Sequence, residues 1–469
     1  MTAALALSVG GLGRAQAFRT LCNFNNPDSV NPYGGLIISS NVLYGVTTGT
    51  GPGDLPNLWT LGTVFKVNAD GAGFTILHRF IGYYNDGVNP RGRLLLCGNT
   101  LYGTTLSSVF AVNTDGTGFR ALHFFDQWFD YTNGWNAYSG LVLVGNTLYG
   151  TTSEGGRGGG IVYAINTNGS GFTRIHDFIL TDGATNPQGG LVALGDKLYG
   201  TTIGPYNGAI FSLKTDGSEF TVLHTLSSTN NNSTNADGAN PKADLFLSGN
   251  VLYGTTVFGG LRGAGTVFAI NTDGTGFTTL HNFDPHSDSA FPGIGLDITG
   301  NTIYVSRNTL YGTASGGGRS GNGTIFTLNA DGTGFTTVYE FSSTFPPDAP
   351  PDFTAGKNVD GAYPVNCLLL TSNTLYGTTV YGGTWGFGTA FSLSFLPQLS
   401  GCCSASNMVL SWPTNYFGFD TSGFILRSTT NLASPVWRTN FPTPLLVNGR
   451  YTVTNPITAA QQFFSLTGQ

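Results

Sequence analysis

Short apolar runs alternate with polar positions along most of the chain, and turns rich in Gly, Asn or Asp separate them. Residues 189–226 show the unit, in which four runs predict strands at 190–194, 197–202, 209–214 and 220–226. The turns at Gly195-Asp196 and Asp216-Gly217 are of the kind that joins antiparallel neighbours. The pattern therefore predicts one four-stranded antiparallel sheet per unit, with strands a, b, c and d.

This unit recurs. Leu-Tyr-Gly, which falls in strand b, occurs seven times at intervals of 47 to 65 residues. Its tyrosines are Tyr44, Tyr102, Tyr149, Tyr199, Tyr253, Tyr311 and Tyr376. Periods of this length indicate propellers or solenoids, and four antiparallel strands make one propeller blade. Because a parallel solenoid would not need a hairpin in nearly every repeat, we predict an all-β fold with a seven-bladed β-propeller.

The two ends of the repeat region complement each other. The last repeat, residues 367–395, contains strands a, b and c but no strand d. Residues 18–24 (FRTLCNF) copy strand d of an earlier repeat, residues 277–283 (FTTLHNF), almost residue for residue. We therefore expect the N-terminal strand to pair with the strand around 389–395. This pairing would close the ring and remove two open sheet edges.

Two finer expectations follow from the strand pattern. Period-two alternation in strand d places Phe74, Ile76, His78 and Phe80 on one face of the sheet. The glycine that recurs in strand b, such as Gly45, is expected to let neighbouring sheets approach closely.

The segments outside the repeats predict export and a second domain. An apolar run at residues 3–12, followed by Ala15-Gln16-Ala17, is typical of a secretory signal peptide over residues 1–17. The propeller is expected over residues 18–396. Alternating runs over residues 397–469 predict a small C-terminal β-sandwich. The expected location is extracellular or at the cell surface.

Composition narrows the class of protein. Gly accounts for 70 of 469 residues, charged residues for only 9% and aromatic residues for 13%, which excludes ordinary disorder. A net charge of −6 argues against a nucleic-acid partner, and no apolar run is long enough for a transmembrane helix. Five cysteines without a C-x-x-C pair do not indicate zinc or thioredoxin chemistry. Cys402 and Cys403 form either a strained vicinal bridge or two unpaired thiols.

The combined repeat motif resembles a known family. It reads D-G-A-N-P, then S/G-N-x-L-Y-G-T-T, then G-G…G-x-V-F, and finally N-x-D-G-x-G-F-x-x-L-H-x-F. Instances are residues 265–268 (GTVF) and 273–277 (DGTGF). Over residues 18–395 it is similar to the GloVer tandem-repeat family of secreted bacterial proteins. The second repeat departs from the pattern in its b–c loop (Leu106-Ser107-Ser108), and the sixth has Tyr339 in place of His. The resemblance implies a cell-surface or extracellular protein and no established reaction. The tail resembles a β-domain that ends many secreted bacterial proteins.

Neither recurring polar motif predicts a metal site. One His per repeat, on the outermost strand, leaves neighbouring imidazoles too far apart to share an ion, so packing or hydrogen bonding is the preferred interpretation. These histidines are His78, His123, His176, His224 and His281. Each Asp-Gly or Asn-Gly before strand d offers too few oxygens for calcium and is interpreted as a hairpin turn. No phosphate loop or nucleophile elbow is evident. We predict no catalytic residue, metal or other cofactor.

Candidate binding residues lie in the b–c and d–a connections, which vary in length and share one face of the ring. Aromatic rings in these loops would stack on sugars or pack at an interface, and Arg157, Arg262 and Arg319 accompany them. The aromatic candidates are Trp59, Tyr84, Trp128, Tyr131, Trp135, Tyr206 and Trp385. Four acids that precede strand a are expected around the channel mouth, as turn formers or as ligands to a cation or sugar hydroxyl. They are Asp86, Asp182, Asp237 and Asp360.

These residues leave more than one function open. The preferred hypothesis is a secreted or cell-surface module that binds a glycan or a surface protein through the loop face. The alternative is a carbohydrate-active enzyme, a polysaccharide lyase or glycoside hydrolase, with its site at the channel mouth. A purely structural surface-layer component is a third hypothesis. The ligand and the oligomeric state are not predicted.

Overall fold

The computed structural model describes most of the chain, which divides into two compact units. The larger unit holds Arg19–Leu370 and Tyr376–Ser392, and the smaller one consists mainly of Leu393–Gln469. The described residues are 16–25, 30–49, 61–82, 85–125, 131–231, 233–284, 304–306, 308–344, 356–365, 367–397, 399–404, 407–416, 419–431, 435–439, 441–456 and 462–468. The expected signal peptide lies outside them, except for Gln16 and Ala17, which begin the first strand.

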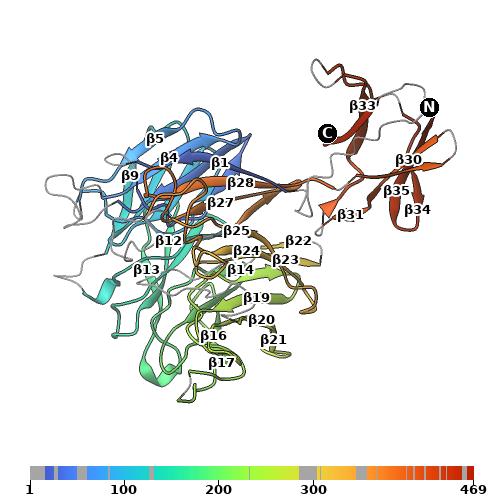
Figure 1. Ribbon diagram of the computed structural model, residues 1–469. Helices are drawn as coiled ribbons and strands as arrows, with labels where there is room; N and C mark the ends of the chain where they lie inside the picture. Colours follow the sequence, from blue (N-terminus) through green and yellow to red (C-terminus); the bar gives the residue numbers. More distant parts are fainter. Residues whose placement is uncertain are drawn as a thin grey trace. The chain divides into compact units, whose positions relative to one another are not determined.

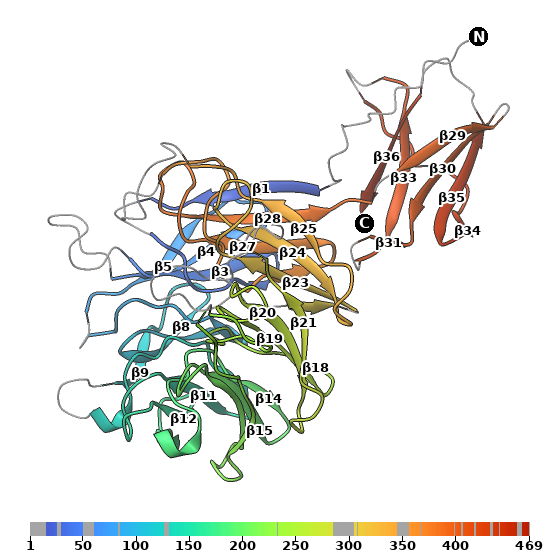
Figure 2. The ribbon, with the colours of Figure 1, turned by 60° about the horizontal axis from the view of Figure 1, so that its bottom comes forward.

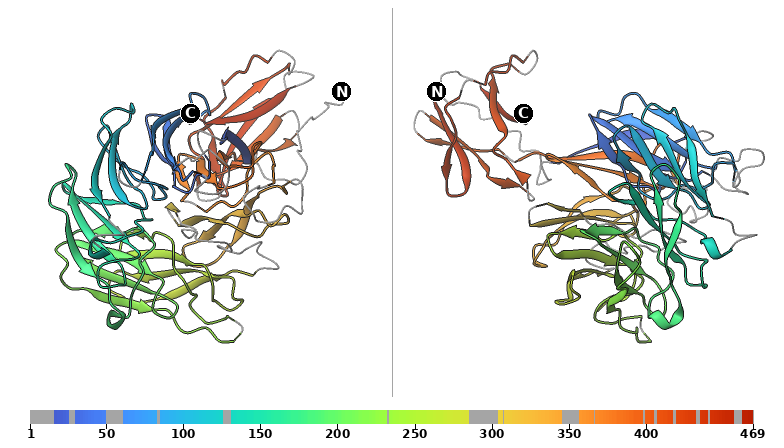
Figure 3. Two further views of the ribbon diagram at one scale, coloured as in Figure 1. Left: turned by 90° about the vertical axis from the view of Figure 1, so that its left-hand side faces the viewer. Right: turned by 180° about the vertical axis from the view of Figure 1, so that it is seen from behind.

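The larger unit is all-β and β-propeller-like. Its described strands form seven four-stranded sheets, which Figure 3 (left) shows following one another around a common centre. The first two sheets contain β2 (Ile37–Ser39), β3 (Val42–Thr47), β4 (Thr63–Asn68) and β5 (Thr75–Arg79), then β6 (Leu95–Cys97), β7 (Thr100–Thr104), β8 (Ser108–Asn113) and β9 (Arg120–Phe124). The next two contain β10 (Val142–Val144), β11 (Thr147–Thr152), β12 (Ile161–Asn166) and β13 (Thr173–Asp177), then β14 (Val192–Leu194), β15 (Lys197–Thr202), β16 (Ala209–Lys214) and β17 (Thr221–Thr225).

The remaining sheets complete the series. The fifth and sixth contain β18 (Phe246–Ser248), β19 (Val251–Thr256), β20 (Thr266–Asn271) and β21 (Thr278–Asn282), then β22 (Tyr304–Ser306), β23 (Thr309–Ala314), β24 (Thr324–Asn329) and β25 (Thr336–Glu340). The last contains β26 (Leu369–Thr371), β27 (Thr374–Thr379), β28 (Thr389–Phe395) and β1 (Gln16–Asn23). Short 3₁₀ helices, η1 (Tyr131–Asn133) and η2 (Leu180–Asp182), lie in two d–a connections.

The predicted unit is confirmed, with strand ends within two residues in the repeat used to define it. The Asp-Gly hairpin interpretation is also confirmed. Asp216 Oδ1 accepts a 2.9 Å hydrogen bond from the Ser218 amide, and Gly217 between them has φ 85°, a conformation that glycine adopts without strain.

The N-terminal strand pairs with the last repeat, as predicted. β1 is the edge strand of a sheet with the order β1-β28-β27-β26, and Figure 1 shows it beside β28. The Phe24 amide donates a 3.1 Å hydrogen bond to the Gly388 carbonyl. Thr20 Oγ1 donates to the Val359 carbonyl at 2.9 Å, just as Thr279 Oγ1 in β21 donates to the Ala236 carbonyl at 3.0 Å. β1 therefore takes the place of strand d.

Aromatic side chains of strand d join each sheet to the next. The His78 ring stacks on Phe119 of the second sheet at 3.5 Å between centroids, and Phe80 packs edge-on against Phe110 at 5.2 Å. Equivalent His–Phe stacks occur at His123, His176, His224 and His281. Across the closure, Phe24 packs against Phe65 of the first sheet at 5.1 Å. The same ring contact thus continues from the last sheet to the first.

The predicted alternation within strand d is wrong because a β-bulge interrupts it. Phe65 pairs with Ile76, whereas the adjacent Val64 pairs with His78, so one residue of β5 is left without a partner in the register. After the bulge, the side chains of β5 lie on the opposite face of the sheet from the one that simple alternation predicts. Phe74 contacts Phe24 of the preceding sheet, whereas His78 contacts the following sheet. The same shift recurs in the five other sheets whose c–d registers are described.

The strand-b glycine also has a different role from the one predicted. Gly200 pairs with Phe211 of its own sheet, and a Cβ at Gly200 would lie 2.6 Å from Phe211 Cζ and 2.9 Å from Leu191 Cδ2. Gly45 has the equivalent surroundings in the first sheet. The glycine makes room for a phenylalanine ring of the same sheet, not for a neighbouring sheet.

A methyl group at this glycine is expected to destabilise the larger unit. Because Phe211 is fully buried and cannot move away freely, we expect Gly200→Ala to lower the free energy of unfolding by about 1–3 kcal/mol in urea denaturation. Phe211→Leu removes the opposing ring atoms, so the double variant should lose less than the sum of the two single losses. Strict additivity would show that the ring and the glycine do not interact.

The smaller unit contains a four-stranded and a two-stranded sheet that share one apolar cluster. The first has the order β29 (Ser400–Ser404), β30 (Asn407–Pro413), β35 (Arg450–Pro456) and β34 (Leu445–Val447), and the second pairs β33 (Phe424–Thr429) with β36 (Phe463–Gly468) (Figure 2). A short pair, β31 (Asn415–Tyr416) and β32 (Phe419–Asp420), adjoins β30 in sequence. Trp412, Leu426 and Val453 lie in the shared cluster. The thiol of Cys402 is free.

Candidate functional site

The d–a connections and the b–c loops form one hydrogen-bonded surface, which we call the loop face. Each described d–a connection pairs with the b–c loop of the sheet that it leads into. Ala239 and Phe258 exchange backbone hydrogen bonds of 2.7 and 3.0 Å, and Ala362 and Tyr381 exchange bonds of 2.8 and 3.0 Å. Antiparallel bridges at Trp135–Glu154 and Thr185–Gly204 repeat the arrangement. Side chains on the loop face are therefore held by an ordered backbone.

Large apolar side chains are exposed on this face. Tyr206 is 83% exposed and Trp385 is 53% exposed, both in b–c loops. Among the described residues of the larger unit, every large apolar side chain that is more than half exposed lies on the loop face. The others are Ile81, Leu180, Leu261 and Val359. The predicted Arg157, Arg262 and Arg319 are also exposed.

The other predicted aromatic residues do not add to this surface. Trp59, Tyr84 and Trp128 lie outside the described residues, and Tyr131 is described only as the start of η1. Trp135 is 6% exposed, so its expected availability for stacking is wrong. The antiparallel bridge between Trp135 and Glu154 holds its backbone against the following b–c loop, and its ring is buried beneath the surface.

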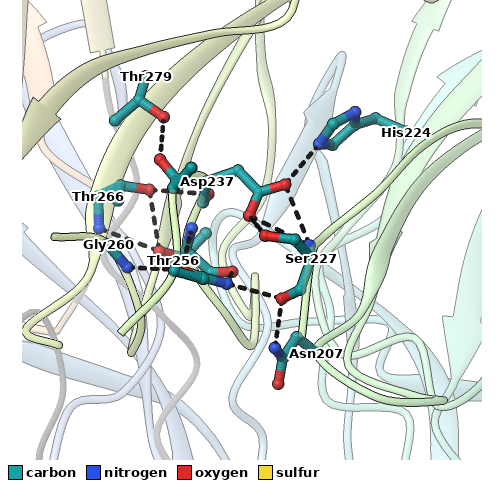
Figure 4. A network of polar contacts seen from close by, with 11 residues as sticks. Asn207, His224, Ser227, Asp237, Thr256, Gly260, Thr266 and Thr279 are labelled. Atoms are coloured by element: carbon teal, nitrogen blue, oxygen red, sulfur yellow. Dashed lines mark hydrogen bonds and ion pairs between the residues drawn. The ribbon is translucent and has the colours of Figure 1, made fainter. Parts of the chain in front are cut away.

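The four predicted acids do not surround the channel mouth. Asp237 contacts the outermost strand of the preceding sheet: its carboxylate accepts from His224 Nε2 at 3.0 Å and from the Ser227 amide and hydroxyl (Figure 4). Asp86 accepts from His78 Nε2 at 2.8 Å, and His176 lies 3.4 Å from Asp182. These carboxylates fasten each d–a connection to strand d. Their position at the mouth is therefore a wrong prediction. The packing or hydrogen bonding predicted for the histidines is confirmed, with hydrogen bonds to the carboxylates at His78 and His224.

The sixth sheet contains the same arrangement with a different donor. Tyr339 Oη donates to Asp360 at 2.8 Å, and the Ser342 amide donates at 2.9 Å. Asn358 Oδ1 accepts from the Gly361 and Gly383 amides, as Asn235 Oδ1 does from the Gly238 and Gly260 amides. Burial and the neighbouring carboxylate raise the pKa of Tyr339, so the phenol remains the donor at neutral pH. Asp237 and Asp360, 9% and 4% exposed, are therefore structural acids.

His78 and His176 make the free energy of unfolding depend on pH. Burial lowers the pKa of His78 and His176 below the ordinary 6.5, despite the opposing effect of Asp86 and Asp182. Below about pH 6.5 the unfolded chain therefore binds more protons than the folded chain. The contribution of these histidines to the free energy of unfolding is complete above this pH, and it is lost as the pH decreases towards their pKa values in the folded state. We expect His78→Tyr with His176→Tyr, which introduces the donor found at Tyr339, to weaken this decline between about pH 7 and 5. Denaturant midpoints that fall equally in both proteins would contradict this.

A cavity of about 560 Å³ lies where the first strands of six sheets meet. Its lining is largely aliphatic and comes from β2, β6, β10, β14, β18 and the residues before β26. Two charged residues, Arg93 and Asp244, are part of the lining. Both stand immediately before the first leucine of strand a, where the other described repeats have small residues. Those are Gly35, Gly140, Gly190 and Cys367. The sequence analysis missed this pair, although the break in a Gly-Leu pattern was visible.

The two charges share the cavity without touching. Asp244 Oδ1 accepts a 2.5 Å hydrogen bond from the Gly190 amide. Burial raises the pKa of Asp244, and this hydrogen bond and the charge of Arg93 only partly oppose it. No described residue forms a hydrogen bond or close ion pair with the Arg93 guanidinium. Both side chains are half-buried, so solvent reaches them through the cavity.

No described group of three ligating side chains could hold a metal ion. Within the same residues, helices of the length and apolar character needed to cross a membrane do not occur.

Solved structures are similar to the chain only at low sequence identity. The chain is 9% identical to oligogalacturonate lyase from Vibrio parahaemolyticus, with 81% of this chain and 97% of that chain covered and a TM-score of 0.46. It is 10% identical to the N-terminal domain of Nup159, with 81% and 96% covered and a TM-score of 0.43. No curated protein matches the chain. Likenesses at this level carry no information about ligand or activity.

The repeat motif is more informative. The model of the Gloeobacter/Verrucomicrobia repeat matches residues 106–306 and 206–400, more than half of the chain. This match confirms the resemblance read from the L-Y-G-T-T and D-G-x-G-F strings. The chain therefore belongs to the Gloeobacter/Verrucomicrobia repeat family.

Proposed function

We propose that this protein is a secreted or cell-surface carbohydrate-binding module that acts through the loop face of a closed seven-bladed β-propeller. The smaller unit is a β-sandwich in this proposal. One observation carries it: among the described residues of the larger unit, the large apolar side chains that are more than half exposed, such as Tyr206 and Trp385, all lie on that face. Exposed apolar side chains held on a rigid backbone are typical of binding surfaces.

The chemistry of these residues favours a sugar ligand. Tyr206 and Trp385 each offer a flat ring with a polar tip, which packs on the C–H face of a pyranose while leaving a hydrogen-bonding group for its hydroxyls. Tyr206 has φ 64°, a conformation that costs a bulky residue energy and is often retained at functional sites. The exposed Arg157 would favour acidic glycans, whereas the exposed Arg262 and Arg319 lie 3.8 Å from the carboxylates of Asp284 and Glu340.

The enzymatic alternative has less support. Asp86, Asp237 and Asp360 are buried and engaged by hydrogen bonds from His, Tyr or Ser groups. A glycosidase needs a pair of carboxyl groups that flank the substrate. These acids instead belong to separate d–a connections.

Binding is tested with a glycan array probed by the full chain, followed by titration of a captured glycan. We expect Tyr206→Ala with Trp385→Ala to weaken binding by at least about tenfold, because both rings are exposed and their loss spares the core. Leu194→Ala, 39% exposed in β14 outside the loop face, is the matched control and should leave binding unchanged.

Two results would overturn the proposal. In the first, no glycan is captured and a surface protein is bound instead. In the second, new reducing ends or unsaturated sugars appear when the chain is incubated with a glycan, which would favour the enzymatic alternative.

A further inference from the structure

The central cavity is separate from the loop-face aromatics and has a different chemical character. Its walls are mainly Leu, Val, Ile and Ala side chains of the first strands, and its volume of about 560 Å³ lies within the usual range for small-molecule sites. Strand a follows the d–a connection, so the residues that begin it lie at the end of the cavity nearest the loop face. Arg93 and Asp244 are at this end.

Comparison of the repeats shows that the fold does not require a charged residue at the position of Arg93 and Asp244. Gly140 and Gly190 occupy the same position in the two sheets between Arg93 and Asp244. A Cβ at Gly190 would lie 2.8 Å from Asp244 Oδ1, and a Cβ at Gly140 would lie 3.1 Å from the Arg93 carbonyl oxygen. The two glycines therefore leave room beside the charged residues, and repeats with glycine at this position fold without either charge.

The charges are not arranged as a structural ion pair. Asp244 has the Gly190 amide as its hydrogen-bond donor, and no described residue satisfies the Arg93 guanidinium. Removing an isolated charge from water is costly unless an opposite charge or hydrogen-bond donors compensate it. A carboxylate and a guanidinium at one end of an apolar cavity are complementary to a ligand that carries both charges and an apolar body.

We propose that the cavity binds a small zwitterion with an apolar side chain, an amino acid or short peptide, whose carboxylate pairs with Arg93 and whose ammonium pairs with Asp244. The guanidinium fork suits a planar carboxylate, and the half-buried Asp244 carboxylate gains from a cation that replaces lost solvation. The apolar side chain would lie along Leu94, Leu141 and Leu245 of the wall.

The test uses calorimetry and thermal melting of the full chain with L-leucine and the dipeptide L-leucyl-L-leucine. Either probe should bind and raise the melting temperature. 4-Methylpentanoate, which lacks the amine, and isopentylamine, which lacks the carboxylate, should each bind at least about tenfold more weakly.

The variants separate a binding role from a structural one. Asp244→Asn keeps an acceptor for the Gly190 amide, and Arg93→Gly introduces the residue found at Gly140. Both should fold, as circular dichroism will show, and each should weaken binding of the probe by at least about tenfold. Tyr206→Ala should have no effect, which distinguishes this site from the loop face. The inference is overturned if neither probe binds, if the deaminated probe binds equally well, or if both variants bind normally.

Discussion

Phe24→Ala is expected to cause one of the largest losses of stability in this chain. The Phe24 side chain is 1% exposed and packs edge-on against Phe65 at 5.1 Å, in the contact that joins the last sheet to the first. Truncation of a buried phenylalanine costs about 3–5 kcal/mol, because it removes the transfer free energy and leaves a cavity. The loss should also free β1 from β28 and expose a sheet edge.

The matched control is Phe74→Ala. Phe74 contacts the Phe24 ring at 5.9 Å but is 38% exposed, so solvent can fill the space that it leaves. Its loss should be about 1 kcal/mol. Equal losses for Phe24→Ala and Phe74→Ala in denaturant unfolding would show that the closure contributes nothing beyond an ordinary surface ring.

Asp237→Ala is the second substitution with a large expected effect. It leaves His224 Nε2 and the Ser227 amide and hydroxyl without their acceptor in a partly buried site (Figure 4). Unpaired buried donors cost about 1–3 kcal/mol each, and partial access of water should reduce the total to about 2–4 kcal/mol. The measurement is the free energy of unfolding, together with protection of the Ser227 amide from hydrogen exchange.

Asp216→Ala is the control because it removes the same Asp-Gly dipeptide signal from an exposed turn. Asp216 accepts only local hydrogen bonds from Ser218, so its loss should be much smaller than that of Asp237→Ala. If the two variants are equally destabilised, the d–a connection is held by turn formation alone and the contact with strand d is incidental.

These two aspartates also show where sequence reasoning reached its limit. Each of these aspartates precedes a glycine, and the Asp-Gly dipeptide predicts a turn at both positions. Only the fold brings the His224 imidazole, thirteen residues before Asp237, within 3.0 Å of one of them. The β1–β28 pairing was predictable because it depends on matched sequence copies. The bulge at Leu77 was not, because alternation within one strand carries no information about its partner.

The candidate sites likewise contain some features that the sequence predicts and others that depend on contacts formed only in the fold. Aromatic residues in variable loops were predictable, but the burial of Trp135 depends on a contact between two loops that the sequence does not specify. Asp244 is not part of an Asp-Gly pair and was not predicted as a site residue; it interrupts the Gly-Leu pattern at the start of strand a. Its importance becomes visible only when six first strands line one cavity.

Hydrogen exchange of the β1 amides tests the closure of the ring most directly. If β1 serves as strand d of the last sheet, its amides and that of Phe24, which follows it, should exchange as slowly as their counterparts in and directly after β21, whose sequence β1 copies. Exchange of the β1 amides at the rate of an unstructured tail, while β21 stays protected, would contradict the closure and with it the single loop face on which the proposed function depends.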